Sequence, residues 1–306
     1  MSLKSLIAPA LHQIAWSTGF STSRAKSLHV GRIVTFHGVG DEYYSVTEFE
    51  SQLRWLARNF SIVSLGCLVE RMDSELTDEI VLTFDDGLRN NFTHAWPILK
   101  KLNIPATFFV VPGLIESDHW IWTHELRARL ALLPPAAKRQ LLPDTPATEE
   151  AVLNHVKTLG LRARNDVQDK LRQLTPEFQP APTQHTRYDL MSWAELQQLD
   201  SPLITIGSHS MTHPILSTLT GSELAAEFHE SRRMLEDRLQ KPIEFFCYPN
   251  GSHNPEVIQT AREHYRAAVS NEARFVHPGM DLHQLPRIGI PPDISLLAWR
   301  THRPTA

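Results

Sequence analysis

Strand-like apolar runs alternate with helix-like segments along much of the chain, and this alternation limits the fold more than any other feature. Residues 80–84 and 105–111 are almost continuously apolar, which is typical of parallel strands covered on both faces. Amphipathic helical patterns, for example over residues 47–59 and 222–239, separate such runs. The pattern predicts about eight strands joined by helical crossovers, hence an α/β fold built as a barrel or as an open doubly wound sheet.

Residues 115–190 interrupt this alternation. They contain several helical patterns divided by prolines, and we predict a helical insertion that leaves one strand end and caps the functional site. Residues 1–28 are expected to form an N-terminal helical extension. The chain is therefore predicted to be a single catalytic domain, residues 1–306, that carries these two additions.

Composition argues against several classes of function. The formal net charge of −4, the pI near 6.5 and the scattered Lys and Arg residues give no electrostatic case for nucleic-acid binding. Two cysteines, Cys67 and Cys247, imply neither a disulfide framework nor a cysteine-based zinc site, and they fit a reducing compartment.

No export signal is recognised near the N-terminus, and no apolar run approaches the roughly 18 residues that span a bilayer. A cytoplasmic location is therefore expected. The N-terminal helix could touch a membrane surface, although packing on the domain is the favoured interpretation.

Two adjacent carboxylates, Asp85 and Asp86, stand at the C-terminal end of the predicted strand 80–84. Successive side chains on an extended backbone point to opposite sides, so the two are expected to act differently, one on a metal ion and one on water. An ordinary Asp-Gly turn is the alternative interpretation. Other polar side chains also follow predicted strands, at the end where reactive groups gather in a parallel barrel: His37, His209 and Tyr248.

His209 and His213 are four residues apart, so on a helical turn both imidazoles would lie on one face and could bind one cation. Such a pair can arise by chance in a chain with 16 histidines. With Asp86 it forms a set of two histidines and one carboxylate, which leaves open positions on a zinc-like ion. Open coordination predicts a catalytic ion that activates water and polarises an amide oxygen.

Thr83-Phe-Asp-Asp-Gly87 and His209-Ser-Met-Thr-His213 resemble the first two motifs of the NodB-homology polysaccharide deacetylases, carbohydrate esterase family 4. The resemblance covers roughly residues 30–115 and 190–290, and it implies a distorted (β/α) barrel of about seven strands. It also implies that Asp85 is the general base and that Asp86, His209 and His213 bind the metal. Zn²⁺ is the expected ion, although Co²⁺, Ni²⁺ or Fe²⁺ would also suit these ligands.

Phe246-Cys-Tyr-Pro-Asn-Gly251 resembles the third motif of the family. The resemblance implies that Tyr248 offers its backbone N–H to the oxyanion, where preorganised donors have a large effect. The arginine that usually begins this motif is missing. We expect Arg287 to hold Asp85 ionised in its place.

The general-acid histidine of the family usually comes late in the chain in a Leu-x-His pattern, which this sequence lacks. Phe36-His37-Gly-Val39 resembles instead the N-terminal element of a permuted branch of the family. His37 is therefore expected to protonate the leaving amine. A histidine merely hydrogen-bonded at a strand end is the alternative, and Asp41 could orient the ring.

Aromatic and histidine side chains in or next to the insertion are weaker candidates. Trp120, Trp122 and Trp193 could form platforms for sugar rings, although tryptophans in a globular domain more often belong to the core. His119 and His124 could line a substrate channel or be solvated on the insertion.

The predicted function is that of a metal-dependent deacetylase that hydrolyses the N-acetyl group of an amino sugar in a saccharide or saccharide precursor. Without an export signal, a cytoplasmic lipid-linked or nucleotide-linked precursor is favoured over a cell-wall polymer. One alternative is a hydrolase of the same fold acting on a non-sugar amide or a formyl group. Another is a metal-containing carbohydrate-binding module without turnover, which Asp85 disfavours because only water activation needs a second carboxylate.

Overall fold

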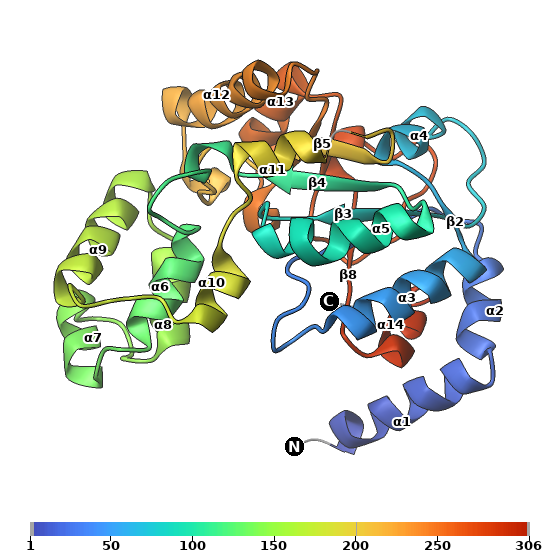
Figure 1. Ribbon diagram of the computed structural model, residues 1–306, viewed down its shortest axis with the longest axis horizontal. Coiled ribbons are helices and arrows are strands. Elements are labelled where there is room, and N and C mark those ends of the chain that lie inside the picture. Colours follow the sequence, from blue (N-terminus) through green and yellow to red (C-terminus); the bar gives the residue numbers. More distant parts are fainter. Residues whose placement is uncertain (1–2, 200, 305–306) are drawn as a thin grey trace.

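A single curled parallel sheet organises the chain, of which the computed structural model describes residues 3–199 and 201–304 (Figure 1). Within the described residues the strand order is β7-β6-β5-β4-β3-β1-β8, and β2 pairs with β3 beside this path. All of these pairings are parallel. The strands are β1 (Arg32–Phe36), β2 (Ser61–Ile62), β3 (Glu79–Phe84), β4 (Ala106–Val110), β5 (Ile204–Ser208), β6 (Phe245–Cys247), β7 (Ala267–Val269) and β8 (Ile288–Gly289).

The two ends of the sheet meet at one short seam. A parallel bridge joins Val269 of β7 to Leu285, a few residues before β8. Ser270 donates its N–H to the Leu285 carbonyl at 2.8 Å, and Leu285 donates to the Ala268 carbonyl at 3.1 Å. The sheet is therefore a distorted barrel, and the expected (β/α) barrel of about seven strands is confirmed.

Alternating strand residues divide between the two faces of the sheet, as the pleat requires. Ile33, Val81 and Phe109 belong to one buried cluster, whereas Val34 and Leu82 belong to the cluster under the surrounding helices. The helices over this second cluster are α3 (Val46–Asn59), α5 (Trp96–Leu102), α11 (Trp193–Gln198), α12 (Gly221–Leu239), α13 (Pro255–His264) and α14 (Ile294–Arg300), whereas α4 (Leu65–Glu70) packs on the first cluster. Apolar layers on both faces explain why β3 and β4 read as continuous apolar runs.

The insertion forms a lobe beside the barrel with a hydrophobic cluster of its own, which includes Leu126, Leu130 and Val152 (Figure 1). Its helices are α6 (Trp122–Leu130), α7 (Pro135–Leu141), α8 (Glu149–Val156), α9 (Leu161–Leu174) and α10 (Pro182–Tyr188). The sequence patterns did not predict α7 and α10. Pro135 and Pro182 were interpreted as breaks, but each is the first residue of its helix. A proline is tolerated there because its missing N–H would form no hydrogen bond within the helix.

The helix predicted over residues 47–59 begins slightly earlier, with Ser45 as its N-cap. The Ser45 hydroxyl accepts the Glu48 N–H at 3.2 Å, and the Glu48 carboxylate accepts the Ser45 N–H at 2.8 Å, which together form a capping box. The strand β2 that follows is short, since Ser64 already caps α4.

The N-terminal extension consists of α1 (Leu3–Ser17) and α2 (Phe20–Lys26). The His12 ring lies 4.9 Å from the ring of Trp299 on α14, which is the packing that was favoured. Leu11 and Ile14 remain more than half exposed, and contact with a membrane surface stays a prediction. No helix of the described residues has the length and hydropathy needed to cross a bilayer.

Candidate metal centre and active site

Asp85 and Asp86 take different directions at the end of β3. Asp85 continues the alternation of Val81 and Thr83 into the barrel interior, where it is 2% exposed. Asp86 has a φ of 73°, a left-handed conformation that turns its carboxylate away from the line of the strand. The two carboxylates therefore point in different directions, as the strand pattern predicted. The left-handed backbone at Asp86 produces this difference.

A buried guanidinium holds the Asp85 carboxylate. Arg287, just before β8, donates from Nη1 to Oδ1 and from Nη2 to Oδ2 of Asp85, each at 2.7 Å. The remaining Arg287 donors are satisfied by Ser270, Asn271 and Thr83. Burial alone would raise the pKa of Asp85, but the Arg287 charge outweighs it and holds this pKa well below its usual range. The structure thus places Arg287 where the sequence analysis expected it.

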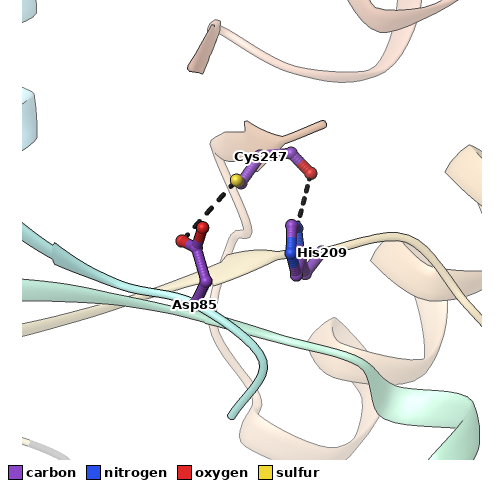
Figure 2. Close-up of side chains that lie close together, drawn as sticks. All are labelled: Asp85, His209 and Cys247. Atoms are coloured by element: carbon purple, nitrogen blue, oxygen red, sulfur yellow. Dashed lines mark hydrogen bonds between the residues drawn. The ribbon is translucent and has the colours of Figure 1, made fainter. Parts of the chain in front are cut away.

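Cys247 lies between the Asp85 carboxylate and the His209 ring (Figure 2). Its thiol is 3.6 Å from Asp85 Oδ1, and its backbone carbonyl lies 2.7 Å from His209 Nδ1, which therefore donates to it. Burial raises the pKa of this thiol, so it is a neutral group. The carbonyl of Cys247 fixes the tautomer of His209 and leaves Nε2 unprotonated and free for a cation.

His209 and His213 are brought together by a loop after β5, and the expected helical turn is wrong. Ser210 and His213 have left-handed φ values of 63° and 58°, and the loop that carries the two histidines is not helical. The His209 and His213 ring centroids are still only 4.8 Å apart. Buried Glu227 of α12 supports the loop by accepting the N–H groups of Met211 and Thr212 at 2.8 and 2.9 Å. Sequence reasoning did not find Glu227, which lies in an ordinary helical pattern.

Asp86, His209 and His213 fit a divalent metal ion. Oδ1 of Asp86 lies 3.6 Å from His209 Nε2 and 3.5 Å from His213 Nε2. Ligands at about 2.0–2.1 Å from a tetrahedral ion lie roughly 3.3–3.4 Å apart, close to these separations. Burial lowers the pKa of His213 to about 3 and also lowers that of His209, so both imidazoles are neutral and can donate lone pairs. The three buried groups therefore form a donor set with room for an ion at its centre.

A second cluster of potential ligands, Asp85, His209 and Cys247, does not fit a cation. The Arg287 guanidinium already contacts both its carboxylate and its thiol, the latter at 3.1 Å. His209 Nδ1 is committed to the Cys247 carbonyl. A metal ion there would meet a fixed positive charge, so the site nearer Asp86 is the candidate metal centre.

A cavity of about 400 Å³ opens on this centre. Asp86 lines it together with His37, whose side chain is exposed and free to meet a ligand. The Asp41 carboxylate accepts the N–H groups of Tyr43 and Tyr44, both at 2.9 Å. Within the described residues it forms no hydrogen bond or ion pair with His37, so the suggested orientation of the ring by Asp41 is not observed. His37 thus lies at the mouth of the metal centre, and no carboxylate of the described residues forms a hydrogen bond or an ion pair with it.

Tyr248 does not fit the role expected for it. Its backbone N–H donates to the Val269 carbonyl at 3.2 Å, as part of the ladder between β6 and β7. The phenol is buried and donates to the His283 carbonyl at 2.9 Å, and burial raises its pKa. The assignment of the Tyr248 N–H as oxyanion donor is therefore corrected, because that donor already has a partner in the sheet.

The insertion reaches the metal centre through α6. Trp122 donates from Nε1 to the His213 carbonyl at 2.8 Å, and His124 Nε2 lies 3.7 Å from Oδ2 of Asp86. Burial lowers the pKa of His124 to about 4. His119, by contrast, is exposed and borders a separate cavity of about 600 Å³ with Trp120. The sequence alone could not separate His124 from His119, because the two lie only five residues apart in the insertion.

The three tryptophans considered as platforms for sugar rings differ in burial. Trp122 and Trp193 are buried core residues, 3% and 7% exposed. Trp120 is half-buried, and its indole N–H donates to Asp189 at 2.9 Å. Trp120 borders the cavity of about 600 Å³, and Trp120 and Trp122 both border another cavity of about 360 Å³.

Comparison with known proteins points to one family. Residues 74–269 match the family model described as polysaccharide deacetylase. YxkH of Bacillus subtilis, provisionally assigned as a polysaccharide deacetylase, is 21% identical over 253 residues, which are 81% of this chain and 66% of that protein. The poly-beta-1,6-N-acetyl-D-glucosamine N-deacetylase of Staphylococcus aureus is 30% identical over 82 residues, 25% of this chain and 28% of that protein. The chain thus spans less than two thirds of these curated relatives.

Solved structures share the fold. IcaB from Ammonifex degensii superposes with a TM-score of 0.62 at 18% identity, covering 89% of this chain and 97% of that one. The deacetylase PplD of Streptococcus pyogenes, in complex with acetate, gives a TM-score of 0.60 at 18% identity, covering 90% and 99%. At these identities the likeness concerns the arrangement of strands and helices.

Proposed function

Since this chain belongs to the polysaccharide deacetylase family, we propose that it hydrolyses the N-acetyl group of an amino sugar in a saccharide or saccharide precursor. The observation that carries the proposal is the pairing of a metal donor set with a separate ionised carboxylate, Asp85, at the same end of the parallel sheet. The name of the S. aureus relative, an N-deacetylase of an N-acetylglucosamine polymer, supports an N-acetyl sugar as substrate. A cytoplasmic location remains a prediction.

Asp86, His209 and His213 would hold the metal ion, with Zn²⁺ favoured by this ligand set and Co²⁺, Ni²⁺ or Fe²⁺ also compatible. When bound, such an ion lowers the pKa of a water molecule and polarises the amide carbonyl. The protein orients these ligands through the Cys247 carbonyl and the Glu227 carboxylate described above.

Asp85 is proposed as the general base that takes a proton from the attacking water. Arg287 keeps its carboxylate ionised, so it can accept a proton at one oxygen, and the same guanidinium holds it in position. In this proposal Arg287 takes the place of the arginine that usually begins the third motif.

His37 is proposed as the general acid, and His37→Ala tests this role. We expect kcat to fall by about 10²-fold, the lower end for loss of a general acid, because bulk water can partly replace an exposed donor. Metal affinity should not change, since His37 is outside the donor set. Steady-state kinetics and metal titration measure both quantities, with His229→Ala, an exposed histidine of α12, as the matched control. Undiminished turnover in His37→Ala would remove His37 from the mechanism.

The proposed reaction is tested by acetate release from N-acetylated saccharides. A panel of neutral oligosaccharides and of lipid-linked and nucleotide-linked amino sugars would be offered to the metal-loaded protein. We expect at least one member to release acetate and leave a free amine in equal amount. No release from any sugar by protein that holds its metal would direct the assignment to a non-sugar amide or a formyl group, or to a binding module without turnover.

A further inference from the structure

The insertion places one more histidine against the metal centre than the donor set requires. His124 lies on the first turn of α6, with a side chain only 14% exposed. Its Nε2 is 3.7 Å from Oδ2 of Asp86. We propose that His124 is a positioning residue, which donates a hydrogen bond to Asp86 and fixes this carboxylate for metal binding. This inference rests on the metal centre proposed above.

The two oxygens of Asp86 face different groups. Oδ1 lies near His209 Nε2 and His213 Nε2, whereas Oδ2 lies near His124 Nε2. Oδ1 is therefore the oxygen available to an ion at the donor set, and Oδ2 is left for an outer partner. Carboxylates that bind metal ions are usually held in this way by a second group, which sets their orientation.

The position of His124 separates it from the donor set. Ligand atoms of Asp86, His209 and His213 all lie within 4.8 Å of one another, and His124 does not join this group. Its Nε2 faces Oδ2 of Asp86, where a protonated ring nitrogen would donate a hydrogen bond to the carboxylate. His124 is therefore placed as a hydrogen-bond donor to Asp86 rather than as a fourth metal ligand.

Packing keeps the His124 ring in place. The ring stacks on Tyr188 of α10, with centroids 4.7 Å apart and planes 25° from parallel. Two residues earlier, Trp122 donates to the His213 carbonyl. The present 3.7 Å exceeds a hydrogen bond, but contacts of this kind are often long before the ligand is bound. The first turn of α6 thus touches two members of the donor set, and the insertion becomes part of the metal centre.

The test compares metal affinity in His124→Phe and His124→Gln. Phe keeps an aromatic ring for Tyr188 and removes the N–H, whereas Gln keeps an N–H donor of similar reach. Zn²⁺ dissociation constants would be measured by competition with a chromogenic chelator. We expect about 10–100-fold weaker binding in His124→Phe, the usual effect of losing such a partner. His124→Gln should recover most of the affinity.

Three controls define the outcome. His155→Phe, at an exposed position of α8 in the same insertion, should bind Zn²⁺ like the wild type. Asp86→Ala should lose Zn²⁺; if it does not, the proposed metal centre fails and this inference fails with it. Should His124→Phe not fold, His124→Leu carries the same expectation.

Equal Zn²⁺ affinity in wild type and His124→Phe, with Asp86→Ala defective, would overturn the positioning role alone. The Co²⁺-loaded proteins add a spectroscopic readout. If His124 acts from outside the donor set, the cobalt absorption bands of His124→Phe keep their pattern once the site is saturated. A change to the spectrum of a protein with one fewer imidazole ligand would make His124 a direct ligand and contradict the proposal.

Discussion

Asp85→Asn is expected to lower turnover by about 10²–10⁴-fold, the range for loss of a general base, while the protein still binds its metal. The amide occupies the same volume but cannot take a proton from water. Metal binding should survive because Asp86, His209 and His213 are unchanged and Asp85 lies outside their set. Single-substrate kcat values and metal content per chain measure the two expectations.

A matched control comes from an Asp–Arg pair on the surface. Asp237 pairs with Arg233 at 3.3 Å on α12 and is largely exposed, so Asp237→Asn should leave turnover unchanged. If Asp85→Asn kept most of its activity, water activation by Asp85 would be excluded. If it lost activity together with its metal, Asp85 would be needed to build the site rather than to act in it.

Arg287→Ala is expected to destabilise the protein by about 3–5 kcal/mol at pH 7, as is usual when one partner of a buried ion pair is removed. Both side chains are almost completely buried, so the Asp85 charge would be left without compensation. Denaturant unfolding at equilibrium measures the change in free energy. Activity should fall as well, because burial raises the pKa of an unpaired carboxyl group.

The loss of folding stability in Arg287→Ala should depend on pH in a defined direction. In the wild type the folded pKa of Asp85 lies below its unfolded value of about 3.9, so its contribution to stability is present above that pH and is lost as pH falls through the folded pKa. In Arg287→Ala we expect the pKa of Asp85 in the folded protein to lie above its unfolded value. Lowering the pH then protonates Asp85 and removes the unfavourable buried charge. The stability gap between the two proteins should narrow from pH 7 to about pH 4.

A double variant separates the ion pair from the rest of the Arg287 contacts. Asp85→Ala combined with Arg287→Met removes both charges and should be less destabilised than the sum of the single changes. Additive effects, or an Arg287→Ala protein with normal stability and an unchanged pH–rate profile, would show that Arg287 does not hold Asp85 ionised.

Sequence patterns located the reactive groups better than they described the backbone that holds them. The strand before Asp85 was predictable because burial on both faces demands a continuous apolar run. The pairing of His209 with His213 was predicted correctly for the wrong reason. Left-handed conformations at Ser210 and His213 bring the rings together, and nothing in their residue types requires such conformations.

Contacts between distant segments were hardest to predict. The Tyr248 N–H is used by the neighbouring strand, and strand register cannot be read from a local motif. Arg287 was predicted because the third motif lacks its usual arginine, so another cation was needed to hold Asp85 ionised. His124 had no such signal, since its contact with Asp86 depends on how the insertion folds back.

The seam of the barrel links the closure of the sheet to the proposed acid–base chemistry. Leu285, which closes the ring against β7, stands two residues before Arg287, whose guanidinium crosses the interior to Asp85. Ser270 takes part in both, since its N–H bonds to Leu285 and its carbonyl accepts from Arg287. Local opening of this seam would move Arg287 away from Asp85, the proposed general base. We therefore expect that local fluctuations which open the seam lower the proposed activity, even where the rest of the domain stays folded.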